Sequence, residues 1–89
     1  MILKVRIISP KEDLFSGEVT SVSSVNSVGA FDILPGHAKF VTMVAKHPLI
    51  LRFQNGEKKE FNFDMAIIHV KEDQVNIYTN PLSAGMNVN

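Results

Sequence analysis

The chain has 89 residues, of which 45% are hydrophobic and 20% charged, and nine basic residues balance nine acidic ones. This length suits one small domain, and the hydrophobic share is too high for a disordered tail. The basic residues are dispersed, so no nucleic-acid partner is expected, and the absence of cysteine excludes disulfides and thiolate chemistry. No apolar segment approaches the roughly 18–20 residues of a membrane-spanning helix, so no direct membrane insertion is expected.

Alternating hydrophobic and polar residues predict β-strands along the first half of the chain. Residues 3–8 form the first such run, and turn formers at 9–13 end it. A short run follows at 14–16, Gly17 predicts a bulge or a bend, and strand character resumes at 19–22. After a predicted loop at 26–29, a short strand is expected up to Leu34.

The second half of the chain continues with five predicted strands, at residues 40–44, 49–54, 60–64, 65–70 and 75–77. Between the second and third of these strands, Asn55-Gly56 is the preferred pair for a type I′ hairpin turn. Because residues 65–70 are apolar on both faces, we expect them to form a central strand.

Short strands at close spacing predict an all-β fold, an antiparallel β-sandwich or flattened barrel of two stacked sheets. We expect this domain to span residues 1–79, followed by a flexible polar tail at 80–89. The predicted core contains Val5, Ile7, Phe15, Phe31, Ile33, Leu51, Phe61, Phe63, Ile68, Val75 and Ile77.

The most specific motif lies in residues 28–38, with the sequence VGAFDILPGHA. Pro35 presets the first central position of a tight turn, and Gly36 can adopt the positive φ that a type II turn requires. This stretch resembles the Gly-x-Phe-x-Ile-Leu-Pro-Gly-His-Ala signature of the epsilon subunit of F-type ATP synthases. The early residues 9–10 (Ser-Pro) and 14–19 (Leu-Phe-Ser-Gly-Glu-Val) are also similar to that family, and the likeness continues to about residue 79.

The resemblance implies a non-catalytic rotor subunit that couples rotation of the c-ring to the gamma subunit. It implies a peripheral position at the cytoplasmic face of the bacterial plasma membrane, with no cofactor, metal or small-molecule substrate. The side facing the c-ring is expected to comprise Ser27, Val28, Ala30, Asp32, Pro35, Gly36, His37 and Ala38. The side facing gamma is expected to include Ile8, Ser9 and Met43.

Two departures from the family pattern bear on function. The family tends to carry acidic residues where this chain has Val28 and Ala30, so electrostatic docking to the ring is expected to be weaker, with Asp32 as a substitute. The 89 residues also include no counterpart of the two-helix C-terminal hairpin typical of the family. Because inhibition of ATP hydrolysis and ATP sensing belong to those helices, the chain is expected to couple rotation without restraining hydrolysis.

Other interpretations remain open on the residues alone. His37 fits a solvated turn residue as well as an interface donor or acceptor. The three histidines do not have the spacing of a zinc site, and neither a Gly-x-Ser-x-Gly elbow nor a phosphate-binding loop is present, which disfavours a metal site and an enzyme. The alternative function is a stand-alone β-sandwich that binds a protein or a ligand.

Overall fold

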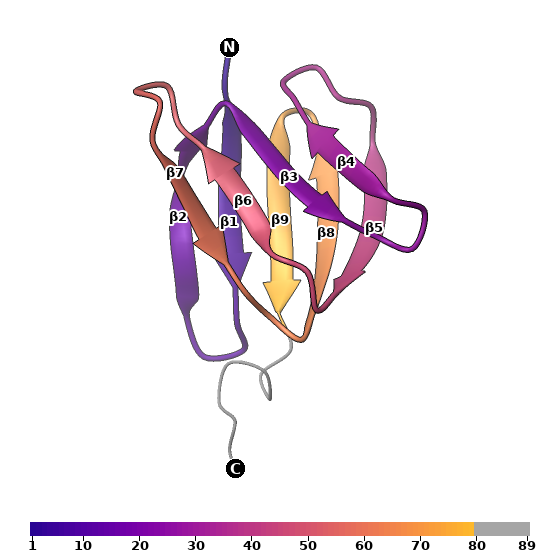
Figure 1. The fold of residues 1–89 in the computed structure, drawn as a ribbon. Helices are drawn as coiled ribbons and strands as arrows, with labels where there is room; N and C mark the ends of the chain where they lie inside the picture. The colour runs from indigo at the N-terminus through magenta and orange to yellow at the C-terminus, as the bar shows by residue number, and fades with distance from the viewer. Residues whose placement is uncertain (80–89) are drawn as a thin grey trace.

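The computed structural model describes residues 1–79, which form two stacked sheets (Figure 1). In spatial order, the larger sheet contains β2 (Asp13–Val19), β1 (Leu3–Ile8), β9 (Gln74–Thr79), β8 (Met65–Lys71) and β5 (Phe40–Ala45). The smaller sheet contains β4 (Ala30–Ile33), β3 (Ser21–Val25), β6 (Leu49–Arg52) and β7 (Lys58–Phe61). The predicted sandwich is confirmed, and within residues 1–79 the two sheets stay separate and do not close into a barrel. The predicted tail at 80–89 lies outside the described residues.

Neighbouring strands run antiparallel in every pair of the described sheets except β1 and β9, which run parallel. β1 lies between β2 and β9, and its second neighbour is the last of the described strands, so no hairpin dictates that pairing. The bulge expected at Gly17 is not at that residue, because Gly17 pairs with Val5 in regular register. The register shift lies between Ile7 and Ile8 of β1, where β2 has one extra residue, Leu14, between the paired residues Phe15 and Asp13.

The chain crosses between the sheets at Thr20, where the sequence predicted one continuous strand. The Thr20 amide and hydroxyl both donate hydrogen bonds to the carbonyl of Arg52, at 2.7 and 3.0 Å. These bonds fix the corner between β2 and β3, so the two halves of the predicted strand belong to different layers.

The core between the sheets consists of inward-facing aliphatic side chains. It contains Leu3, Val5, Ile7, Val19, Val22, Ile33, Val44, Leu49, Leu51, Ala66, Ile68, Val70, Val75 and Ile77. Among residues 1–79, two of the three buried polar side chains form hydrogen bonds: the Ser24 hydroxyl donates to the Pro48 carbonyl, and the Thr79 hydroxyl donates to the Ile8 carbonyl. Every aliphatic residue of the predicted core is therefore confirmed, and the core is larger than predicted.

The four phenylalanines of the predicted core are only partly buried, which corrects that prediction. They belong to outer strands or to a connection, so they close the long edges of the sandwich and do not fill its centre. At the β2/β7 edge, the Phe15 ring meets Phe53 and Phe61 edge-on, with centroids 6.0 and 5.9 Å away. At the β4/β5 edge, Phe31 packs edge-on against Phe40 at 5.8 Å. T-shaped ring pairs of this kind add stability beyond the area they bury.

Of the two turn types predicted from the sequence, one is confirmed and the other is wrong. Leu34 accepts a hydrogen bond from the His37 amide at 3.0 Å and Gly36 has φ +85°, which confirms the type II turn. At Asn55-Gly56 only the glycine has positive φ, and both the Gly56 N–H to Phe53 O and the Phe53 N–H to Glu57 O bonds form. This geometry is a type I turn followed by a glycine bulge, so the predicted type I′ turn is wrong.

Candidate partner-binding surfaces

Four apolar side chains form a row across the outer face of the larger sheet. The strand register aligns Ile8 with Tyr78, Tyr78 with Ile67, and Ile67 with Met43. Ile8 is half-buried, whereas the other three are 45–54% exposed. We call these four residues the apolar row. Single exposed apolar residues are ordinary, but a contiguous apolar area on a folded domain marks an interaction surface.

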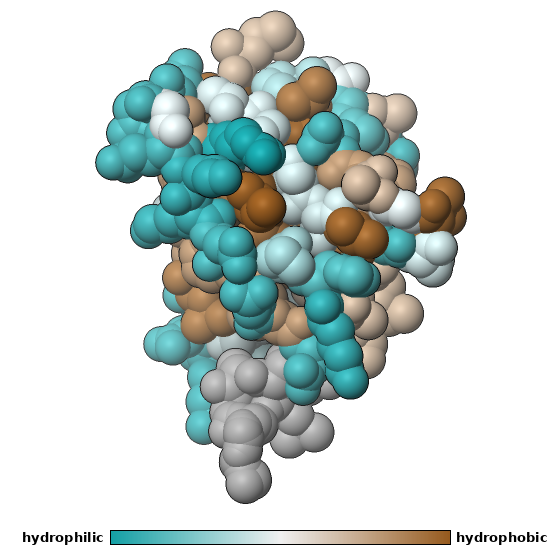
Figure 2. Space-filling model, viewed as in Figure 1, coloured by the Kyte–Doolittle hydropathy of each residue, from teal (hydrophilic) through white to brown (hydrophobic). Residues whose placement is uncertain are grey.

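Further apolar side chains extend this face toward β5 and the start of β8. Val41 and Met65 lie on the same face as Met43 and Ile67 by strand alternation, and they are 63% and 38% exposed. The opposite side of the molecule differs. Figure 2 looks onto the smaller sheet and shows a mostly hydrophilic surface in which hydrophobic residues are scattered. The extended apolar area therefore belongs to one of the two outer faces.

Two of the three residues predicted to face gamma, Ile8 and Met43, belong to the apolar row. Ser9 follows directly at the end of β1, where its hydroxyl donates to the Glu12 carbonyl at 2.8 Å and accepts from the Glu12 amide at 3.2 Å. Tyr78, Ile67, Val41 and Met65 were not predicted to lie on this surface. The sequence did not mark Met65 and Ile67 as exposed, because residues 65–70 are apolar on both faces and predicted a central strand.

The residues predicted to face the c-ring do not gather at a single loop end. Ser27 and Val28 lie in the β3–β4 connection, where the Asn26 side chain accepts hydrogen bonds from the amides of Val28 and Gly29. Val28 is 94% exposed at this tip. The Pro35–Ala38 segment follows the other end of β4. Figure 1 shows the two connections at opposite ends of that strand, the first at the right of the molecule and the second at its top.

His37 is not a freely solvated residue at the tip of its turn. Its ring is half-buried and packs against Phe40, with centroids 5.3 Å apart. The preceding residue is anchored as well, because the Gly36 amide donates a hydrogen bond to the Asp73 carboxylate at 2.7 Å. The turn is therefore tied both to β5 and to the β8–β9 hairpin.

Asp32 lies on the outer face of the smaller sheet, with its carboxylate engaged in a polar network. The Ser23 hydroxyl donates to this carboxylate and accepts a hydrogen bond from the Arg52 guanidinium at 2.8 Å. Ala30 is exposed on the same strand. Because a cation lies one hydroxyl away, Asp32 presents less net negative charge to a partner than a free carboxylate would.

The two candidate surfaces meet along the β4/β5 edge of the sandwich. The Asn26 side-chain amide donates to the Thr42 hydroxyl of β5 at 2.9 Å. The Phe31 ring of β4 packs on the Phe40 ring of β5. This edge thus joins β4, which together with its two connections holds the predicted c-ring residues, to β5, which carries Met43.

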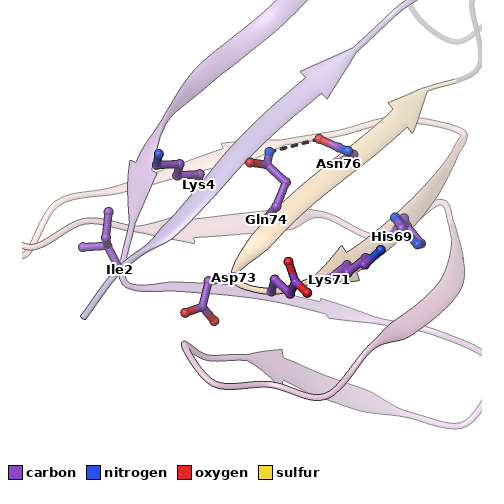
Figure 3. Close-up of a pocket in the computed structure, with 8 residues that line it drawn as sticks. Ile2, Lys4, His69, Lys71, Asp73, Gln74 and Asn76 are labelled. Carbon is purple, nitrogen blue, oxygen red and sulfur yellow. Dashed lines mark hydrogen bonds between the residues drawn. The ribbon is translucent and has the colours of Figure 1, made fainter.

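The hollows of the described surface are open, and most of the residues that line them are polar or charged. One of about 540 Å³ lies beside the β8–β9 hairpin, where Lys4, Gln74 and Asn76 project from the sheet and Asp73 extends away from Gln74 (Figure 3). A second hollow, also of about 540 Å³, lies between the Gly36 turn and the same hairpin. In the part of the chain that the structure describes, no three His, Asp or Glu side chains gather as a metal site would require, and no helix could cross a membrane.

Comparison with known protein families gives a match over most of the chain. Residues 2–84 match the sequence model of the β-sandwich domain of the ATP synthase delta/epsilon chain. The chain belongs to this family. The match extends five residues past the domain boundary expected at residue 79.

Bacterial ATP synthase epsilon chains are among the relatives of this delta/epsilon domain. The ATP synthase epsilon chain of Leptospira interrogans (serovar copenhageni) is 37% identical over 78 residues, covering 86% of this chain and 60% of the relative. The epsilon chain of Clostridium perfringens (strain SM101) is 34% identical over 79 residues, covering 86% of this chain and 58% of the relative. The chain thus spans about 60% of the length of these curated relatives.

Solved structures have the same fold. A chain in the Euglena gracilis mitochondrial ATP synthase, from a structure of its OSCP, F1 and c-ring parts, aligns with a TM-score of 0.81 at 20% identity, over 88% of this chain and 50% of that chain. A chain in the central stalk and c-ring of the Tetrahymena thermophila mitochondrial ATP synthase aligns with a TM-score of 0.72 at 13% identity, over 86% and 62%.

Proposed function

We propose that this delta/epsilon domain is a non-catalytic central-stalk part of an F-type, proton-translocating ATP synthase, which couples rotation of the c-ring to the gamma subunit. The observation that carries the proposal is the family match over residues 2–84. The structural neighbours support it, because they come from ATP synthase assemblies that contain the c-ring. The domain would be a peripheral component at the cytoplasmic face of the bacterial plasma membrane.

Gamma would cover the outer face of the larger sheet. The apolar row ends at Ile8 and Met43, two of the residues expected on this side, and Ser9 borders it. Burying exposed apolar side chains such as Tyr78 and Ile67 supplies a driving force of about 25 cal/mol per Å² removed from water. A permanent rotor contact of this kind is expected to be more apolar than the rest of the surface.

The c-ring would contact the β4 side of the molecule, along its two connections. The proposed contact set comprises Ser27, Val28, Ala30, Asp32, Pro35, Gly36, His37 and Ala38. Since Val28 and Ala30 are uncharged and Asp32 is linked to Arg52 through Ser23, this contact would depend on shape more than on charge. It would be less sensitive to salt than a contact between oppositely charged surfaces.

The mechanical role follows from how these surfaces are connected. Torque applied to β4 would pass into β5 through the Phe31–Phe40 ring pair and the Asn26–Thr42 hydrogen bond. Behind them lies a core of interdigitated aliphatic side chains, and such cores have low compressibility. The domain would act as a stiff wedge between two rotor parts, and phosphoryl chemistry would occur on other subunits.

A binding experiment tests the proposal. The purified chain is immobilised, and isolated gamma and detergent-solubilised c-ring are passed over it separately. Both are expected to be retained. Met43→Lys should weaken gamma retention at least about tenfold, because a lysine within the apolar row must be desolvated, and should leave c-ring retention unchanged.

The matched control is Glu60→Lys, an exposed charge change on β7 of the smaller sheet. It should leave both partners bound. If neither gamma nor the c-ring is retained by the unsubstituted chain, the rotor proposal fails and the stand-alone binding module becomes the better account.

A further inference from the structure

The type II turn at Leu34–His37 is held by a residue far away in the sequence. The turn makes its own internal bond, from the His37 amide to the Leu34 carbonyl, which leaves the Gly36 amide available. That amide donates to Asp73 Oδ1 at 2.7 Å, and the two residues are 37 positions apart. A bond from an amide to a carboxylate is charge-assisted and stronger than one between neutral groups.

Asp73 occupies a backbone conformation that most residues avoid. Glu72 and Asp73 are the central residues of the two-residue β8–β9 turn and have φ +51° and +63°. Turns with positive φ at both central positions favour Asn-Gly or Asp-Gly, because glycine adopts positive φ freely and Asn and Asp do so at a lower cost than other side chains. Neither position in this turn is glycine. The Asp73 carbonyl is also tied to the sheet, since it accepts a hydrogen bond from the Lys4 amide at 2.9 Å.

This backbone geometry directs the Asp73 carboxylate out of its own hairpin. In Figure 3 the Asp73 side chain extends away from Gln74, the next residue in the chain, and its hydrogen-bond partner is Gly36. Lys71 and Lys39 line the same hollow as Asp73, between the turn and the hairpin. Asp73 is thus fixed at its backbone by β1 and at its side chain by the turn.

The turn is attached on its other side through His37. The imidazole packs on Phe40 at a centroid distance of 5.3 Å, and Phe40 packs on Phe31. Without the Asp73 bond, the Pro35–His37 segment would be held only by its own turn bond and by this ring contact. The hydrogen bond to Asp73 is therefore a separate restraint on how the turn is presented.

We propose that Asp73 is a positioning residue, which sets the orientation of the Pro35–His37 turn through the Gly36 amide and thereby sets the affinity of the β4 side for its partner. The partner is the c-ring in the function proposed above, and the inference rests on that function. A glycine at position 73 would relieve the strain of the positive φ but would also remove the carboxylate. Stability and partner affinity consequently respond in different ways to substitution at this residue.

Three variants separate these effects. Asp73→Gly removes the acceptor and relieves the backbone strain. Glu72→Gly relieves strain in the same turn and keeps the acceptor, so it is the matched control. Asp73→Asn keeps an oxygen acceptor at a position where asparagine tolerates positive φ.

The first readout uses the isolated chain and needs no partner. In Asp73→Gly, hydrogen exchange of the Gly36 amide should accelerate about tenfold, and the His37 ring protons should lose the shift caused by the Phe40 ring. The thermal midpoint should stay within about 3 °C of that of the unsubstituted chain. Glu72→Gly should leave the Gly36 and His37 signals unchanged. Unchanged Gly36 exchange in Asp73→Gly would overturn the proposal.

The second readout is retention by the solubilised c-ring. Asp73→Gly should weaken it about tenfold, the expected effect of losing one hydrogen bond to a charged group, whereas Asp73→Asn and Glu72→Gly should stay within about threefold. If Asp73→Gly accelerates Gly36 exchange but leaves c-ring retention unchanged, the proposed role of Asp73 in binding is overturned. If Asp73→Asn weakens retention as much as Asp73→Gly does, the role of the hydrogen bond to Gly36 is overturned. A lack of retention by the unsubstituted chain is a failure of the proposed function, and it is distinguishable because the Gly36 readout is obtained without the c-ring.

Discussion

Asn26 ties the two layers of the sandwich together by donating its side-chain amide to the Thr42 hydroxyl at 2.9 Å. The same side chain accepts hydrogen bonds from Val28 and Gly29, at 2.9 and 3.2 Å. It thus organises the exposed β3–β4 tip and fastens that tip to β5. One residue sets both the shape of a candidate c-ring contact and its connection to the strand that carries Met43.

Substituting Asn26 should therefore cost more stability than substituting its partner. Asn26→Ala removes all three bonds and is expected to lower the unfolding free energy by about 2–3 kcal/mol. Thr42→Val removes one bond and is expected to cost about 1 kcal/mol. Urea denaturation of both variants checks the order, and a Thr42→Val cost equal to or above that of Asn26→Ala would contradict this role.

Gly17 is expected to be required because of the Phe15 ring. A Cβ at Gly17 would lie 3.0 Å from Phe15 Cζ, and that ring also contacts Phe53 and Phe61. Gly17→Ala should cost about 1–3 kcal/mol through overpacking. In a Phe15→Leu background, which lacks the outer ring atoms, the same change should cost under about 0.5 kcal/mol. Equal costs in both backgrounds, measured by chemical denaturation, would rule out the steric explanation.

The Arg6–Asp13 ion pair should contribute little despite its good geometry. Arg6 Nε and one terminal nitrogen donate to the two Asp13 carboxylate oxygens, at 3.0 and 3.1 Å. Both side chains are 40% exposed or more, so water and salt screen the pair. Asp13→Asn is expected to change the unfolding free energy by less than about 1 kcal/mol, and by still less at 1 M salt. A larger change in the unfolding free energy that is the same at low and high salt would contradict the small contribution expected of this ion pair.

An acidic residue at the β3–β4 tip should strengthen the c-ring contact. Val28 is nearly fully exposed, so Val28→Glu should leave stability unchanged within about 0.5 kcal/mol. If the c-ring approaches this tip, the new charge should raise retention severalfold at low ionic strength and lose its effect at high salt. Val28→Gln is the uncharged control. Weaker retention by the glutamate variant at low salt would contradict the proposed site.

Strand positions could be read from the sequence because most of the strands alternate between one buried and one exposed face. Leu3, Val5 and Ile7 give the pattern of β1 directly, and proline at 35 with glycine at 36 specifies its turn. The parallel pairing of β1 with β9 could not be read, since it depends on which strands meet in space. The pair Asn55-Gly56 also led to a wrong prediction, since this hairpin has a type I turn followed by a glycine bulge and not a type I′ turn.

Prediction from the sequence was least accurate for hydrophobic residues that are not fully buried. Phenylalanines such as Phe15 and Phe61 are large enough to reach the sandwich edges, so they seal the core from outside. Met65 and Ile67 lie on the exposed face of a central strand, and no single-sequence pattern distinguishes a covered face from one that awaits a partner. For the same reason the sequence predicted Ile8 and Met43 individually, but not the row that connects them.

The central claim is most directly tested by coupling in a membrane. Inverted bacterial vesicles carrying an ATP synthase depleted of its epsilon subunit are supplied with the 89-residue chain, and ATP-driven proton pumping and ATP hydrolysis are measured together. The account predicts that pumping is restored with little suppression of hydrolysis, and that Met43→Lys fails to restore it. Pumping that stays at the depleted level, or strong inhibition of hydrolysis by the added chain, would contradict it.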